Sequence, residues 1–77
     1  EISLTKTEFL ILEYFMKNKG LSCSREKIII GVWGYDFDGE EKIVDVYINS
    51  LRKKIDPKSY YIHTIRGFGY IFQYKED

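Results

Sequence analysis

Residues 41–55, Glu-Lys-Ile-Val-Asp-Val-Tyr-Ile-Asn-Ser-Leu-Arg-Lys-Lys-Ile, have helical periodicity and two chemically different sides. At about 100° per residue, one narrow stripe is apolar and consists of Val44, Ile48, Leu51 and Ile55. A stripe of this kind predicts a helix with one buried side. The other side mixes cations, an amide, a hydroxyl and one small apolar group: Lys42, Val46, Asn49, Ser50 and Lys53.

The polar side of this helix has the chemistry that a DNA major groove accepts. Lys53 can reach phosphate or guanine, Asn49 can pair with adenine through two hydrogen bonds, and Val46 can meet a thymine methyl group. A helix face that is merely solvated has the same composition. The periodicity alone therefore leaves both interpretations open.

Length and composition limit the chain to one small folded domain over residues 1–77. The contents of 44% hydrophobic and 17% aromatic residues are typical of a globular core. No run approaches the roughly 18 apolar residues of a membrane span, and no signal peptide is visible, so we expect a cytoplasmic protein. Because Cys23 and His63 are single, an internal disulfide and a zinc site with several Cys and His ligands are excluded.

Charge is distributed unevenly along the chain although the net charge is zero. Residues 1–41 hold five Lys or Arg against eight Asp or Glu, whereas residues 42–75 hold seven against two. A positive second half is the electrostatic feature expected of a surface that binds nucleic acid.

The first two helices are predicted from their caps. Thr5 and Glu8 form a capping box before a helix over residues 6–18, and Leu4 can pack on Phe9. The apolar residues of this helix recur at helical spacing: Phe9, Leu12, Phe15 and Met16. A second helix is expected over residues 25–33, with Ser24 as its N-cap and Gly34 as its stop.

The third helix and the segment after it are predicted in the same way. Asp38 and Glu41 could cap the helix over 41–55, and Pro57 stops it. Two β-branched and aromatic runs, residues 61–65 and 70–74, then flank Arg66-Gly67-Phe68-Gly69. This pattern predicts a β-hairpin whose two glycines permit a positive φ at the tip.

Three helices followed by a hairpin are the elements of a winged helix, and six motifs occur in this order. They are Leu4-Thr-Lys-Thr-Glu-Phe, Ser24-Arg-Glu, Val32-Trp-Gly, Val44-Asp-Val-Tyr-Ile, Leu51-Arg-Lys-Lys-Ile and Thr64-Ile-Arg-Gly-Phe-Gly-Tyr. Over nearly the whole chain the sequence resembles the DNA-binding effector domain of OmpR/PhoB-type response regulators. The resemblance implies an α+β fold, a winged helix-turn-helix.

The resemblance also implies which residues touch double-stranded DNA. The third helix enters the major groove, and the hairpin is a wing that reaches the adjacent minor groove. Positions that match base or backbone contacts of the family are Lys42, Val46, Tyr47, Asn49, Ser50, Arg52, Thr64 and Arg66. Lys53 and Lys54 add phosphate contacts, and Arg66 enters the minor groove. For Arg52 an ion pair with Asp45 is an alternative.

The chain departs from the family pattern in two places. Many relatives carry arginine where this chain has Asn49 and Ser50, so we expect a binding site richer in A·T pairs. The family's domain also opens with a small antiparallel sheet, and only Glu1-Ile2-Ser3 could belong to its last strand. We therefore expect a fragment that lacks this sheet and the phosphoacceptor receiver domain. Apolar groups on the first helix that the sheet would cover must then be exposed, covered by a neighbouring molecule in a crystal, or reorganised, and a large exposed area is unfavourable. The hairpin should lack its possible sheet partner.

Family membership further implies two copies on direct-repeat half-sites, control by phosphorylation of the receiver, and contact with RNA polymerase through residues 35–39. The competing interpretation is a winged-helix module for protein–protein contacts. No cofactor, metal site or enzyme activity is expected, since Asp36, Asp38 and Gly39 do not have the spacing of a calcium loop. We interpret His63 as a strand residue and Cys23 as structural, although a position beside a helix start could lower the pKa of its thiol.

Overall fold

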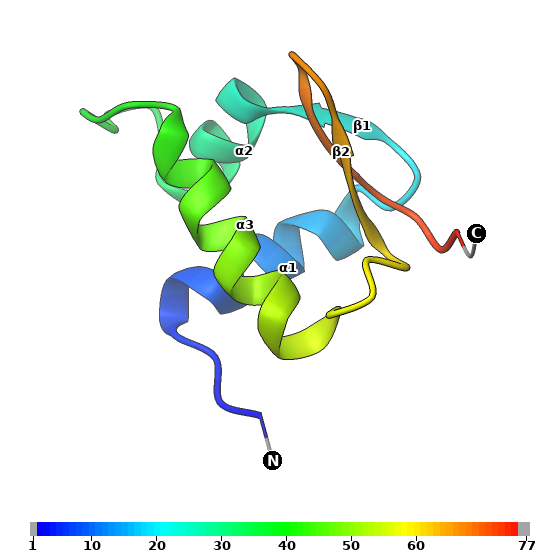
Figure 1. The fold of residues 1–77 in the computed structure, drawn as a ribbon. Coiled ribbons are helices and arrows are strands. Elements are labelled where there is room, and N and C mark those ends of the chain that lie inside the picture. The colour runs from blue at the N-terminus through cyan, green and yellow to red at the C-terminus, as the bar shows by residue number, and fades with distance from the viewer. Residues whose placement is uncertain (1, 76–77) are drawn as a thin grey trace.

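Three helices and one three-stranded antiparallel sheet make up the computed structural model, which describes residues 2–75 (Figure 1). In chain order the elements are α1 (Lys6–Lys17), β1 (Ser22–Ser24), α2 (Arg25–Val32), α3 (Lys42–Ile55), β2 (Ile62–Ile65) and β3 (Gly69–Phe72). The predicted three helices followed by a hairpin are confirmed. No helix within this described part of the chain is long and apolar enough to cross a membrane.

The start of α1 has the predicted capping box. The backbone N–H of Glu8 donates to Thr5 Oγ1 at 3.1 Å, and the backbone N–H of Thr5 donates to Glu8 Oε1 at 2.9 Å. The two bonds satisfy amide groups that a helix start otherwise leaves without a partner. α1 ends at Lys17, one residue before the predicted end.

Both ends of α2 also agree with the sequence. Ser24 Oγ accepts from the backbone N–H of Lys27 at 3.1 Å. The helix ends at Val32, and Gly34 follows with φ of +98°, a conformation that glycine adopts without steric cost. Local caps therefore determine the limits of α2.

The predicted cap of α3 is wrong. Glu41 already has helical φ and ψ of −62° and −20°, and no side chain caps the helix. An N-cap residue normally has an extended backbone from which its side chain can accept, so this geometry does not permit the capping box of Asp38 and Glu41. The N–H groups of Ile43 and Val44 instead donate to carbonyls three residues earlier, at 3.1 Å each.

The core lies between the three helices and the inner side of the sheet. As predicted, Val44, Ile48 and Leu51 of α3 are fully buried, and Ile55 is partly buried. They pack with buried side chains of every other element: Ile11, Phe15, Cys23, Ile28, Ile29, Ile62 and Tyr70. This packing turns the opposite side of α3 outward.

The hairpin has a sheet partner, contrary to the expectation from the sequence. β3 lies in the middle of the sheet and pairs with β2 on one side and with β1 on the other. β1 is only Ser-Cys-Ser, so it carries no alternating pattern long enough to predict a strand. It is held by pairing with residues almost fifty positions later, Cys23 lying opposite Tyr70.

The two glycines near the wing tip have different roles, and the prediction that both permit a positive φ is wrong. Gly67 has φ of +74°. Gly69 does not have a positive φ; it lies in β3, buried, where a Cβ atom would stand 2.1 Å from the carbonyl oxygen of Cys23. Gly69 is therefore needed for the close approach of β1.

The segment between α3 and β2 is organised by one carboxylate. Asp56 is 5% exposed, and its two oxygens accept from the backbone N–H groups of Tyr60, Tyr61 and Ile62 at 2.9 to 3.1 Å. α3 ends immediately before it, at Ile55, as Pro57 predicts. These bonds fix where the chain leaves α3 and enters the wing.

The N-terminal segment and one side of α1 are exposed to solvent. Ile2 and Ser3 are not in a strand, and Glu1 lies outside the described residues. Phe9 and Met16, seven residues apart on α1, are 54% and 62% exposed. Of the three alternatives for the apolar groups of this helix, the structure has exposure at these two residues.

Candidate nucleic-acid interface

The outer side of α3 presents polar groups that the rest of the domain does not use. Lys42, Val46, Asn49 and Lys53 are exposed, Val46 by 61%. Among residues 2–75, no side chain or backbone group forms a hydrogen bond or ion pair with the side chain of Lys42, Asn49 or Lys53. Two cations and one amide are therefore available to a ligand along one side of the helix.

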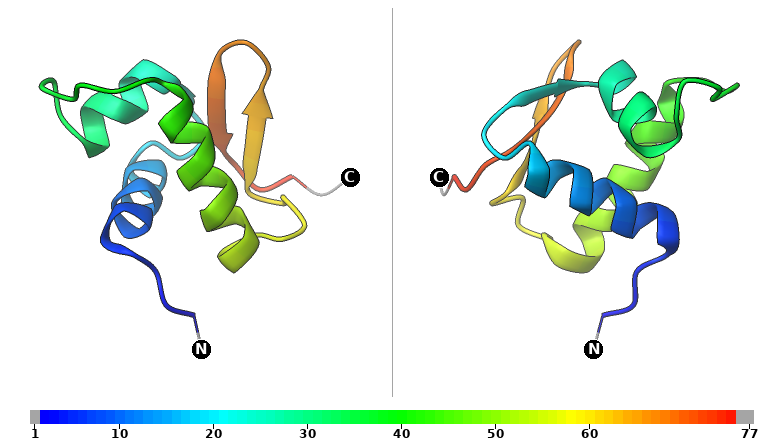
Figure 2. Two further views of the ribbon diagram at one scale, coloured as in Figure 1. Left: turned by 60° about the vertical axis from the view of Figure 1, so that its left-hand side comes forward. Right: turned by 180° about the vertical axis from the view of Figure 1, so that it is seen from behind.

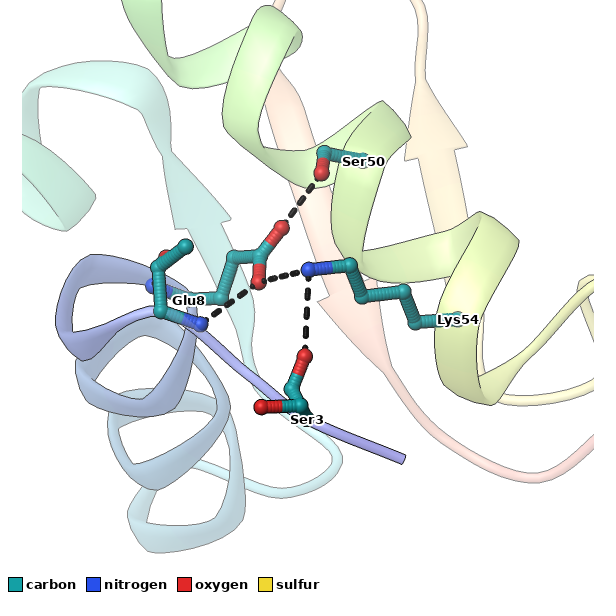
Figure 3. Close-up of polar contacts among 5 residues, drawn as sticks. Ser3, Glu8, Ser50 and Lys54 are labelled. Carbon is teal, nitrogen blue, oxygen red and sulfur yellow. Dashed lines mark hydrogen bonds and ion pairs between the residues drawn. The ribbon is translucent and has the colours of Figure 1, made fainter. Parts of the chain in front are cut away.

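Ser50 and Lys54, two of the residues predicted to touch DNA, bond to Glu8 of α1 in the free domain (Figure 3). The hydroxyl of Ser50 donates to Glu8 Oε2, and Lys54 Nζ donates to Glu8 Oε1 at 2.7 Å and to the carbonyl of Ser3 at 3.2 Å. We call Ser3, Thr5, Glu8, Ser50 and Lys54 the Glu8 cluster. It fastens the beginning of α1 to the second half of α3.

The carboxylate at the centre of the Glu8 cluster is 2% exposed. The hydrogen bond from Lys54, followed by those from Ser50 and from the Thr5 backbone, lowers the pKa of Glu8 from 4.5 to about 2, against the opposing effect of burial. A buried carboxylate that stays ionised must be satisfied by donors. The sequence predicted Glu8 only as a capping residue, because nothing local indicates its partners on α3.

Asp45 and Arg52 do not pair with each other, so the alternative ion pair considered for Arg52 is wrong. Asp45 Oδ1 accepts from Arg25 Nε at 3.0 Å and from the hydroxyl of Tyr70. Arg52 Nε and Nη2 donate to the carbonyl of Ile62 at 3.2 and 2.8 Å. Seven residues of helix separate the two positions by about 10 Å along the axis, and each side chain finds a closer partner on another element.

Arg52 and Tyr70 connect α3 to the wing. Arg52 Nη2 also donates to Thr64 Oγ1 at 2.9 Å. The guanidinium carbons of Arg52 and Arg25 each lie 5.5 Å from the centroid of the Tyr70 ring, within cation–π range. Burial, followed by the hydrogen bond to Asp45, raises the pKa of Tyr70 to about 12. We call Arg25, Asp45, Arg52, Thr64 and Tyr70 the Tyr70 network.

The wing stands beside α3, with its tip near the N-terminal end of that helix (Figure 2). Arg66 is exposed at the tip, and within the described chain its guanidinium has no hydrogen bond or ion pair. Thr64 is exposed on β2; its oxygen accepts from Arg52, and its hydroxyl can still donate its own proton. The wing tip thus offers an exposed cation in addition to those on the outer side of α3.

The remaining predicted positions have mixed surroundings. Tyr47 is partly buried, and its ring lies 5.7 Å from that of Trp33. His63 is half-buried in β2, where its Nε2 lies within 3.0 Å of the carbonyls of Tyr60 and Gln73. Cys23 is buried, and that burial raises the pKa of its thiol, which contradicts the lowered pKa considered from the sequence.

The segment between α2 and α3 borders a hollow on the surface. Tyr35 is 86% exposed there. The hollow is lined by Glu26, Ile29, Ile30, Gly34, Tyr35, Phe37, Gly39 and Glu41. Glu26 and Glu41 make its rim negatively charged, whereas the outer side of α3 is positively charged, so the two surfaces suit different partners.

Comparison with known proteins identifies the family. A family described as "Transcriptional regulatory protein, C terminal" matches residues 1–72. The transcriptional regulatory protein TrcR of Mycobacterium tuberculosis is 49% identical over 73 residues, which are 94% of this chain and 28% of TrcR. The chain thus spans less than a third of that relative's length.

Solved structures agree in fold. The DNA-binding domain of Bacillus subtilis CssR has a TM-score of 0.83 and 42% identity, over 92% of this chain and 78% of that one. The Klebsiella pneumoniae RstA DNA-binding domain, solved in complex with the RstA box, has a TM-score of 0.80 and 31% identity, over 94% and 74%. The chain belongs to the family of C-terminal DNA-binding effector domains of OmpR/PhoB-type transcriptional response regulators.

Proposed function

We propose that this domain regulates transcription by binding double-stranded DNA sequence-specifically, with α3 in the major groove and the wing tip in the adjacent minor groove. The observation that carries the proposal is the row of exposed side chains on α3 that have no partner within residues 2–75, which contains Lys42, Asn49 and Lys53. The similar RstA domain was solved on its DNA box, which supports the same mode of binding here.

Each side chain of the proposed interface has a role that its chemistry supports. Asn49 pairs with adenine, Val46 contacts a thymine methyl group, and Lys42 reads a base edge. Lys53 and Tyr47 contact the phosphate backbone, as does Thr64 through its hydroxyl proton. Arg66 enters the minor groove. With no arginine on the outer side of α3, the preferred half-site is rich in A·T pairs.

Three residues predicted to touch DNA have no such role here, because their side chains already bond to other parts of the domain. Ser50 and Lys54 belong to the Glu8 cluster, and Arg52 belongs to the Tyr70 network. Moving any of these side chains to DNA breaks bonds that the free protein already has, which reduces the gain from the new contact.

The wider setting belongs to the same proposal. The domain is the output part of a regulator controlled by phosphorylation of a receiver domain, and two copies bind adjacent direct repeats in the cytoplasm. The exposed segment around Tyr35 contacts RNA polymerase. The domain acts as a binding module and carries out no enzymatic reaction.

Salt dependence tests the proposed function. Titrating a duplex selected from a random pool at two salt concentrations should show an affinity that falls with salt, because cations that neutralise phosphates, such as Lys53, release counterions. The selected half-sites should be rich in A·T pairs. An affinity for duplex that is absent even at low salt, or binding to a protein partner that salt does not change, would favour the protein–protein module instead.

Two single substitutions on α3 should have different effects on binding. Asn49→Ala is expected to weaken binding by about 1 to 3 kcal/mol and to relax one base position, because the amide reads that base. Lys53→Ala should weaken all duplexes alike and lower the salt slope by about one unit, because the ammonium meets phosphate. Binding to the selected duplex and its single-base variants measures both effects.

The matched control for Lys53 is Lys19→Ala, an exposed lysine just after α1. Its removal should leave the salt slope unchanged. If Asn49→Ala weakened all duplexes equally while Lys53→Ala changed the base preference, the two roles would have to be exchanged.

A further inference from the structure

The wing reaches α3 mainly through a few side chains. α3 packs directly along α1, whereas its backbone makes little direct contact with β2 or β3. Besides the shared apolar core, the side-chain links are the bonds from Arg52 to Ile62 and Thr64, the bond from Tyr70 to Asp45, and the bond from the backbone N–H of Ile62 to Asp56 at the end of α3. Asp56 holds only the start of the wing, so the position of the rest of the wing relative to α3 depends on the Tyr70 network.

The geometry of the network constrains both strands of the wing. The guanidinium group of Arg52 holds β2, because its Nε and Nη2 both donate to the carbonyl oxygen of Ile62, at 3.2 and 2.8 Å. The hydroxyl of Tyr70 holds β3 to Asp45, and Arg25 fixes Asp45 from the start of α2 at 3.0 Å. The ring of Tyr70 is 3% exposed and lies in the core.

We infer that Arg52 and Tyr70 are positioning residues that hold the wing at a fixed orientation to α3, so that Asn49 and Arg66 can reach adjacent grooves at the same time. This inference rests on the proposed function. If the wing is held rigidly, the DNA contacts of Asn49 and Arg66 form together at little extra entropic cost. A loosely held wing must instead be ordered when DNA binds. Arg52 thus acts through Ile62 and Thr64, and a phosphate contact is not required of it.

The first test uses the free protein. Arg52→Lys keeps the charge but loses the planar fork, and Tyr70→Phe removes only the hydroxyl. Residual dipolar couplings of backbone amides should show the wing reoriented or averaged relative to α3 in both variants. Tyr35→Phe, the same change at an 86% exposed position, is the control and should leave the couplings unchanged. Unchanged couplings in Arg52→Lys and Tyr70→Phe would overturn the inference.

The second test uses the selected duplex. Arg52→Lys should weaken binding about tenfold with an unchanged salt slope, because positioning is lost while the charge remains. Arg66→Ala should cost less affinity in the Tyr70→Phe background than in the wild type, since the wing is already misplaced. Wild-type affinity in Arg52→Lys, or strictly additive losses in the double variant, would contradict the inference.

The two proposals fail in distinguishable ways. A wild-type domain that ignores duplex DNA at low salt refutes the proposed function and the role of the network in DNA binding. The dipolar couplings still decide whether Arg52 and Tyr70 orient the wing. Circular dichroism of each variant separates loss of orientation from loss of fold.

Discussion

Replacement of Gly69 by alanine is expected to destabilise the folded domain by about 3 kcal/mol or more. The added Cβ would lie 2.1 Å from the carbonyl oxygen of Cys23 and 2.9 Å from the Cα of Ser24. Both atoms belong to the backbone of β1, so no side-chain rotation can relieve the overlap. β1 and β3 must separate, and the pairing that buries Cys23 and Tyr70 is lost with them.

Urea unfolding of Gly69→Ala and Gly67→Ala measures this effect against a matched control. Gly67 has φ of +74° but open space around its Cα, so alanine there should cost only about 1 kcal/mol of backbone strain. Equal losses at the two positions would contradict the role of Gly69 in the close approach of β1.

Replacement of Glu8 by alanine is expected to cost about 3 kcal/mol of unfolding free energy at pH 7. The change removes one acceptor that serves three donors: the Thr5 backbone N–H, the hydroxyl of Ser50 and the ammonium of Lys54. Lys54 is 36% exposed and can turn to water, which limits the loss. Glu13→Ala, at an exposed position on the same helix, is the control and should change stability little.

The same carboxylate should make stability depend on pH. Because the folded pKa of about 2 lies below the ordinary 4.5, the folded state holds the proton less readily than the unfolded state. The stabilisation is fully present above about pH 5 and is lost as the pH falls through the folded pKa. Glu8→Gln removes this titration, so the difference in unfolding free energy between wild type and Glu8→Gln should shrink as the pH falls from 5 to 2. Parallel curves over that range would contradict the assignment.

These two predictions concern parts of the fold that the sequence did not reveal. The capping box of Thr5 and Glu8, the cap at Ser24 and the stops at Gly34 and Pro57 could be predicted because they act within a few residues. β1 could not, since its pairing with β3 joins positions almost fifty residues apart. The cap of α3 was predicted from a spacing that its backbone conformation does not support.

In the candidate site, too, some features follow from the sequence and others depend on the tertiary structure. The periodicity of residues 41–55 determined that Val44, Ile48 and Leu51 are buried and that Asn49 and Lys53 face outward, and the order of motifs indicated the family. Only the tertiary structure decided that Ser50 and Lys54 bond to Glu8 and that Arg52 bonds to the wing. The physical reason is that helical periodicity fixes the direction of a side chain around its own axis, whereas its partner depends on which distant element packs beside it.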